Sequence, residues 1–182
     1  MSLSMRNKKG LSVRETVTYA VLATILFTSK LVMEALPNIH LCGVLIAVYT
    51  IALRGRALIP MYLFVLLIGL YGGFSPWWLP YLYIWLPIVG VFLLIPQKWP
   101  KKVKFAIYPI ALALHGLLYG TLYAPAQALM FDFSFEQTLA WIASGIPFDL
   151  LHCAGNFCLG FLVLPLSDQL VRLSKGLRVQ RP

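Results

Sequence analysis

The sequence predicts an all-α membrane protein, a compact bundle of six transmembrane helices with the N- and C-termini in the cytoplasm. The first observation is composition: 60% of the 182 residues are hydrophobic and 12% are charged, whereas a soluble domain averages about 45–50% apolar and about 25% charged residues. The second is that the apolar residues form six runs separated by short breaks. The third is that basic residues gather in alternate breaks. We therefore expect one membrane domain over 1–182.

The first half of the chain predicts four spans. The first run follows a basic N-terminal segment, 1–14, and at ~1.5 Å per residue it is long enough for a bilayer core of ~30 Å. The turn 37–40, the pair Arg54 and Arg56 around Gly55, and the Gly- and Pro-containing stretch 72–76 mark the breaks. The expected spans are 15–36, 41–53, 57–71 and 79–95.

The second half predicts two more spans after the basic break 97–102. The fifth is expected over 104–123, and 124–133 is a semi-apolar connection that can form a short helix. Ser134 and Gln137 have the spacing of a capping box, so a helix should start there. Pro147 should kink that helix before the sixth span continues to about Leu170.

The basic residues determine the expected orientation. Every Lys and Arg except Lys30 lies in the N-terminal segment, the second-to-third break, the fourth-to-fifth break or the tail 172–182. With six spans all four segments fall on one side, and the positive-inside rule places that side, with both termini, in the cytoplasm. The net charge of +9 is then explained by topology, and we expect no nucleic-acid partner.

Three polar side chains share one face of the last long run. On a helix, Asp149, His152, Asn156 and Gly160 follow at steps of three, four and four. Strong hydrogen-bonding groups are costly to leave unpaired in a membrane. One interpretation is polar contacts between helices; the other is that this face forms one wall of a binding cavity.

Distances along the helices favour a cavity near the outer surface. At ~1.5 Å per residue, Lys30 and Asn156 lie ~24 Å from the inner edge of the membrane, and aromatic side chains of other spans lie near the same level. The alternatives are that Lys30 reaches the outer headgroups beside Glu34 and that the aromatic residues form an interfacial belt. The breaks at 37–40 and 72–78 are candidate lids. The candidate substrate-binding residues are Asn156, His152, Asp149, Trp85, Tyr81, Tyr119, Lys30, His40 and Trp78.

Known catalytic motifs are missing from the sequence. It contains no G-x-S-x-G, H-E-x-x-H or C-x-x-C pattern, and its three histidines fall at different depths. We therefore expect no enzymatic activity, no cofactor and no bound metal. A stand-alone transporter, an intramembrane enzyme using Asp149 and His152 as an acid–base pair, and a purely structural membrane protein remain open.

Four stretches, taken in order, carry a resemblance that covers nearly the whole chain. They are 36–41 after the first span, 62–67 in the third, 77–85 around Trp78 and Trp85, and 145–149 followed by His152 and Asn156. In this order they resemble the substrate-binding S component of energy-coupling-factor (ECF) vitamin transporters. The resemblance implies a bacterial plasma-membrane protein that binds a vitamin-like or other flat heterocyclic molecule in an outward-facing pocket.

The resemblance also implies partners. Members of that family dock on a T-type transmembrane scaffold through small residues of the first helix, commonly Ala-x-x-x-Ala, and two ATP-binding subunits supply the energy. The matching positions here are Thr16, Ala20 and Thr24, with Ala23 beside them. Small residues allow the close backbone approach on which helix association in lipid depends. The chain itself has no P-loop, so a member of the family would depend on these subunits for transport.

Overall fold

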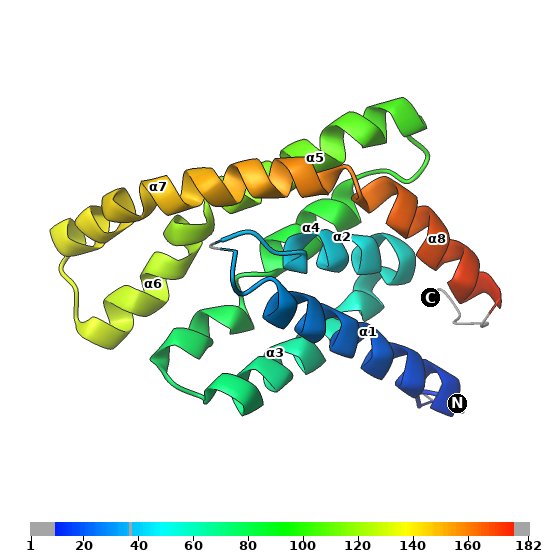
Figure 1. Ribbon diagram of the computed structural model, residues 1–182, viewed down its shortest axis with the longest axis horizontal. Coiled ribbons are helices and arrows are strands. Elements are labelled where there is room, and N and C mark those ends of the chain that lie inside the picture. The colour runs from blue at the N-terminus through cyan, green and yellow to red at the C-terminus, as the bar shows by residue number, and fades with distance from the viewer. Residues whose placement is uncertain (1–9, 37, 177–182) are drawn as a thin grey trace, which may run out of the picture.

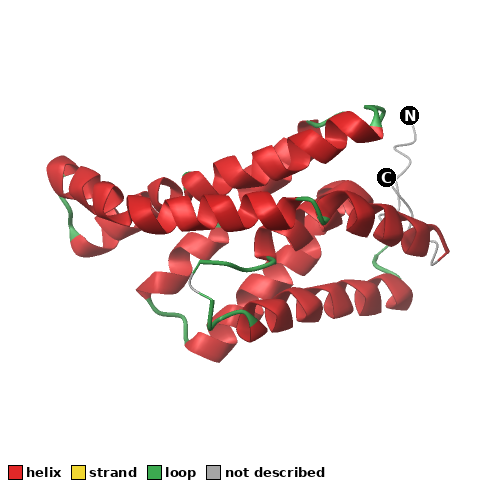
Figure 2. Cartoon of the chain, turned by 45° about the horizontal axis from the view of Figure 1, so that its top comes forward, coloured by secondary structure: helices red, strands yellow, loops and turns green. Residues whose placement is uncertain are grey.

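The structure, a computed structural model, describes residues 10–36 and 38–176. All regular elements in these ranges are helical, and Figures 1 and 2 show the helices joined by short loops. The segments 1–9 and 177–182 contain basic residues for which the sequence predicts a cytoplasmic location, and they lie outside the described residues. The elements are α1 Val13–Val32, α2 Cys42–Leu53, η1 Arg54–Ala57, α3 Leu58–Gly72, η2 Pro76–Leu82, α4 Leu86–Leu94, α5 Lys101–Leu117, α6 Tyr119–Phe131, α7 Phe135–Gly160 and α8 Val163–Gly176.

Several of these elements are long and apolar enough to cross a membrane. By length and composition four continuous stretches qualify, and the pair α7 and α8, bent by 52°, makes a fifth. Each of the six expected spans contains helix, so a six-helix arrangement fits the fold. The four stretches are Val13–Val32, Cys42–Gly72, Pro76–Leu94 and Lys101–Phe131.

The central element is α2, which lies in the middle of the ribbon in Figure 1. All twelve of its residues are buried, as expected for a helix that is hydrophobic on every side. It contacts α1, α4, α7 and α8, and the Tyr49 hydroxyl donates to the Leu22 carbonyl of α1 at 2.9 Å. The other helices are arranged around this buried helix.

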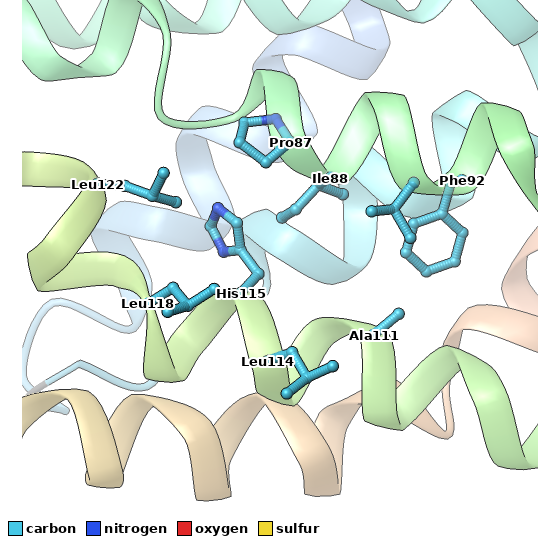
Figure 3. A pocket seen from close by; sticks show the side chains of 9 residues that line it. Pro87, Ile88, Phe92, Ala111, Leu114, His115, Leu118 and Leu122 are labelled. Atoms are coloured by element: carbon cyan, nitrogen blue, oxygen red, sulfur yellow. The ribbon is translucent and has the colours of Figure 1, made fainter.

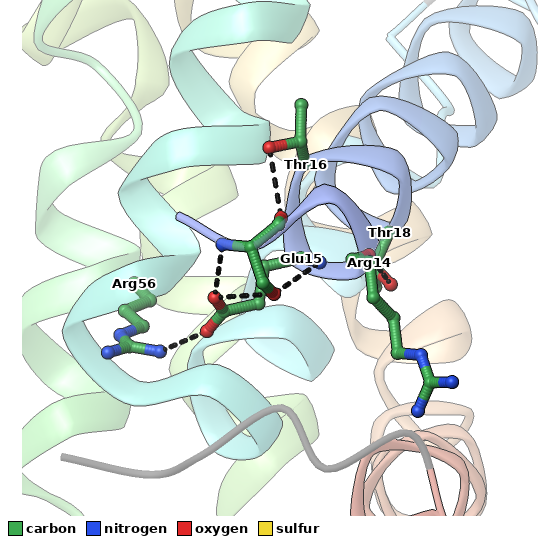
Figure 4. A network of polar contacts seen from close by, with 6 residues as sticks. Arg14, Glu15, Thr16, Thr18 and Arg56 are labelled. Carbon is green, nitrogen blue, oxygen red and sulfur yellow. Dashed lines mark hydrogen bonds and ion pairs between the residues drawn. The ribbon is translucent and has the colours of Figure 1, made fainter. Parts of the chain in front are cut away.

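The start of α1, the start of α5 and the end of α8 lie toward the same end of the molecule (Figure 1). At that end, Glu15 joins two elements in the network of Figure 4. Its carboxylate accepts hydrogen bonds from the Ser12 backbone N–H and hydroxyl, both at 2.9 Å, and so completes a capping box. The same carboxylate forms an ion pair with Arg56 of η1 at 2.6 Å, which fixes α1 to the turn between α2 and α3.

The expected start of the fourth helix is wrong. The span 79–95 was expected to be one α-helix, but Pro76–Leu82 is a 3₁₀ helix and α4 begins only at Leu86. The prolines at 76, 80 and 87 remove backbone donors from this segment, so a continuous α-helix loses several of its hydrogen bonds there.

The second half differs in two further places. The fifth span was expected to reach 123, but α5 ends at Leu117 and α6 begins at Tyr119. The helix α7 is continuous across Pro147, and a separate bend of 52° follows Gly160, between α7 and α8. Pro165 explains that position, because proline fits the first turn of a new helix, where its missing N–H costs no hydrogen bond.

Helices α5 and α7 run side by side and antiparallel in both ribbon views (Figures 1 and 2). One close approach is at Gly116, where a β-carbon would lie 2.8 Å from the His152 carbonyl carbon and oxygen. A second close approach occurs at Gly160, whose β-carbon would lie 2.5 Å from the Pro109 α-carbon. In both places the added β-carbon would meet backbone atoms of the facing helix, so the observed packing requires glycine at these two positions.

We predict that Gly116→Ala destabilises the protein by about 1–3 kcal/mol, because the added methyl group would force α5 and α7 apart. Gly145→Ala is the matched control: it also lies within a helix, but a β-carbon there would meet nothing within 4 Å. That control should be neutral or stabilising by up to ~1 kcal/mol. Thermal unfolding in detergent measures both variants, and equal stability of the two would contradict the assigned contact.

Candidate functional site

The polar face of α7 is buried, as its spacing predicts. Asp149, His152, Asn156 and Gly160 are the residues of this helix that are fully buried. Two of the side chains make contacts between helices. The Asn156 amide donates to the Leu112 carbonyl of α5 at 3.2 Å, and the Asp149 carboxylate accepts from the Gly120 N–H of α6 at 2.9 Å.

The Asp149 contact explains why α6 begins where it does. Gly120 lies in the first turn of α6, where backbone N–H groups have no partner within the helix. The residue before this helix, Leu118, supplies no side-chain hydrogen bond, so the carboxylate of another helix takes the place of the usual cap. The sequence could not reveal this cap, because Asp149 and Gly120 are far apart in the chain.

His152 points instead into a cluster of six rings from different segments. Its ring centroid lies 4.9 Å from that of His40 and 4.6 Å from that of Tyr119. Trp85 lies at the centre of the cluster, with ring centroids of His40, Tyr81, His115 and Tyr119 at 5.9–6.1 Å. We call His40, Tyr81, Trp85, His115, Tyr119 and His152 the ring cluster.

Four nitrogens of the ring cluster are buried and have no hydrogen-bond partner among the residues that the structure describes. A buried polar group without a partner costs about 1–3 kcal/mol, and such groups are uncommon in native proteins. A group of them at one place therefore marks either ordered water or a ligand. The four are His40 Nδ1, Trp85 Nε1, His115 Nδ1 and His152 Nε2.

The hydrogen-bonding character of two of these nitrogens can be assigned. His115 Nε2 lies 2.8 Å from the Ile84 carbonyl oxygen, which can only accept, so Nε2 carries the hydrogen and Nδ1 of the neutral ring is an acceptor. Trp85 Nε1 is always a donor. The cluster therefore contains an unsatisfied donor and an unsatisfied acceptor, and a single molecule with both kinds of group can complement them.

His40 belongs to the loop between α1 and α2. Burial, together with the nearby Lys30 ammonium, lowers the pKa of His40 to about 4. Its imidazole is therefore neutral at physiological pH, with one donor and one acceptor nitrogen.

Two cavities adjoin the ring cluster. One, of about 170 Å³, is lined by His40, Tyr81 and Tyr119 of the cluster and by Lys30, Glu34 and Asn38. The second, of about 310 Å³, also contains Lys30, Glu34 and Tyr81, and extends to Tyr71 and Trp77. The shared residues show that the two spaces are adjacent, and the second reaches the lower end of the size usual for small-molecule ligands, ~300–1,000 Å³.

A third cavity, also about 310 Å³, lies between α4 and α5 and is almost wholly apolar. His115 of α5 is its one polar lining residue and projects toward α4 near Pro87 and Ile88 (Figure 3). The depth of His115 along its helix gave no indication of a role, because its ring joins the cluster through tertiary contacts with Trp85 and Tyr119.

The predicted site residues therefore fall into two groups. Lys30, His40, Tyr81, Trp85, Tyr119 and His152 lie in the ring cluster or line the cavities beside it. Asp149 and Asn156 instead make packing contacts, and Trp78 donates to the Val65 carbonyl of α3 at 2.8 Å. Its neighbour Trp77, which we had not selected, lines the larger polar cavity; its four-residue spacing to Tyr81, with ring centroids at 5.8 Å, was the available signal.

The four predicted docking residues of α1 do not share one surface. Thr16, Ala20 and Thr24 are exposed, and the two threonine hydroxyls donate to carbonyls of the preceding turn, at 3.2 and 2.9 Å. Ala23 is buried within the bundle, with 1% of its surface exposed. The exposed face is therefore Thr16, Ala20 and Thr24, with hydroxyl groups already satisfied by their own helix.

The chain matched no protein-family model, curated protein or solved structure in the comparisons made.

We predict that Asp149→Ala lowers stability by about 1–3 kcal/mol, because it removes the partner of the buried Gly120 N–H. Asp149→Asn retains a side-chain oxygen that can accept the same hydrogen bond and should be much less destabilising. Thermal unfolding of both variants makes the comparison. If Asn and Ala at this position destabilise equally, the carboxylate has a role other than capping α6.

Proposed function

We propose that the protein is the substrate-binding S component of an ECF-type importer in a bacterial plasma membrane. It binds a vitamin-like or other flat heterocyclic molecule at the ring cluster and delivers it with a T-type scaffold and two ATP-binding subunits. In this proposal both termini are cytoplasmic, as the distribution of basic residues predicts. The protein has no catalytic role of its own.

The observation that carries the proposal is the ring cluster with its four unpaired nitrogens. Aromatic faces favour flat ligands, and edge nitrogens that lack partners favour a ligand whose rim carries both donors and acceptors. A heterocyclic ring combines these features. The polar cavities beside Lys30, Glu34 and Tyr81 give room for the rest of such a molecule.

The contact of Asp149 with α6 counts against the rival enzymatic interpretation. An acid–base pair needs Asp149 and His152 to act on one substrate, but the Asp149 carboxylate accepts a hydrogen bond from Gly120 of α6, whereas His152 lies among the rings of His40 and Tyr119. On the buried face of α7, Asp149 and Asn156 thus make packing contacts, and His152 is the residue that we assign to ligand binding.

The first test replaces an unpaired nitrogen by carbon. We predict that His152→Phe retains the ring packing, leaves the ligand-free protein as stable as the parent or more so, and weakens ligand binding by roughly five- to 150-fold, the equivalent of a lost hydrogen bond of about 1–3 kcal/mol. Native mass spectrometry of the purified protein identifies the co-purified small molecule, and calorimetry with that molecule measures affinity. Trp99→Phe, an aromatic change outside the ring cluster and its cavities, is the control. Unchanged affinity in His152→Phe would remove this residue from the binding site.

The second test concerns the partners. We predict that Ala20→Trp abolishes co-purification with a T-type scaffold and two ATPases while ligand binding is retained, because an indole would block close approach of another helix to the exposed face of α1. Leu150→Trp, which adds the same group at an exposed position of α7, should leave the complex intact. Ala23 is unsuitable for this test because it is buried. A complex that tolerates Ala20→Trp would exclude this face of α1 as the docking surface.

A further inference from the structure

A polar cavity of about 140 Å³ lies among α2, the α4–α5 connection and α8, away from the ring cluster. Its charged lining residues are Arg54, Lys104 and Asp168. The rest of the lining is partly polar, from Gln97, Tyr108 and Ser167, and partly apolar, from Ile51, Leu164 and Val171. The cavity thus combines cationic groups with an apolar surface.

The backbone of Arg54 is strained. Its φ of 56° and ψ of −137° fall in a region that glycine occupies readily and other residues rarely do. The next residue, Gly55, is a glycine, but the unusual conformation falls on Arg54. A glycine at position 54 would adopt it without strain. Strain of this kind persists where the surrounding structure imposes it, and such positions cluster at functional sites.

This conformation directs the Arg54 guanidinium across to α4. Nη2 donates to the Leu93 carbonyl at 2.8 Å, near the end of that helix, where carbonyls lack partners. Nη1 is buried and has no hydrogen-bond partner among the described residues. The contact with α4 therefore provides a partner for Nη2 but not for Nη1.

The charges around the cavity are unbalanced. Asp168 is its one acidic lining residue, and its carboxylate is paired with Lys101, outside the cavity, at 2.6 Å. Lys104 donates one hydrogen bond, to the Gln97 carbonyl at 3.2 Å, and an ammonium has three donors. Within the described part of the chain, neither Arg54 nor Lys104 forms an ion pair.

We propose that this cavity binds a phosphate-type oxyanion through Arg54 and Lys104. A guanidinium with a free edge and an adjacent ammonium are the usual protein partners of phosphate oxygens. The headgroup of an anionic phospholipid and free inorganic phosphate offer the same chemistry. The apolar wall favours the lipid, because Ile51, Leu164 and Val171 can contact the first carbons of its acyl chains.

The experiment measures binding of dioctanoyl phosphatidylglycerol, dioctanoyl phosphatidylcholine and inorganic phosphate to the full-length purified protein by native mass spectrometry and calorimetry. We expect one tightly bound phosphatidylglycerol, with affinity reduced at least about tenfold by Lys104→Gln, the effect expected for losing a charged hydrogen bond. Lys102→Gln removes the same charge two residues away in α5, at a position that does not line the cavity, and it should leave the affinity unchanged. Arg54→Gly should weaken binding while relieving the backbone strain.

The outcomes separate the sources of the oxyanion. Inorganic phosphate that binds with the same dependence on Lys104, in the absence of lipid binding, would retain the site and assign it to a soluble anion. Equal losses of affinity in Lys102→Gln and Lys104→Gln would indicate general attraction by the positive charges at the start of α5 and would overturn the proposal. Failure of all three probes to bind would also overturn it. If Arg54→Gly does not fold, the comparison of the two lysine variants still decides.

Discussion

The close approach of α5 and α7 is the contact on which the candidate site depends. Gly116 and Gly160 let the two backbones meet without intervening side chains, and the Asn156 amide adds a hydrogen bond to Leu112 of α5. The Asp149 carboxylate continues the polar face of α7 onto Gly120 of a neighbouring helix, α6. With the helices held at this separation, the rings of His115 and Tyr119 on one side and His152 on the other reach the same space.

This packing satisfies most of the polar groups that it buries but leaves those of the ring cluster unpaired. Asn156 Oδ1 has no partner among the described residues, but the Asn156 amide nitrogen and the Asp149 carboxylate each have a backbone partner on a neighbouring helix, α5 and α6 respectively, as expected where water is excluded. The nitrogens of Trp85 and His152 do not, although they are buried by the same fold. A stable bundle can retain such groups where binding of another molecule offsets their cost, which is why the difference between these neighbouring positions supports a ligand site.

Sequence reasoning identified the correct face of α7 and the capping box at Ser134 and Gln137, because both follow from local spacing. It misplaced the ends of α4 and α5. The break at Leu118 lies between Gly116 and Gly120, but the carboxylate that supports the new helix comes from α7, which the local sequence does not indicate. Depth along a helix also could not separate Asn156 from His152: both are on one face, but which neighbouring helix each side chain meets depends on tertiary packing.

The most direct test of the account is an experimental map of the protein purified from its own membrane without added ligand. The account predicts density for a flat molecule against the ring cluster, with atoms within hydrogen-bond distance of Trp85 Nε1 or His152 Nε2. Ordered waters that satisfy these nitrogens in protein carrying no small molecule would contradict it. In that case the ring cluster would be a hydrated structural core, and the ligand site would have to lie elsewhere.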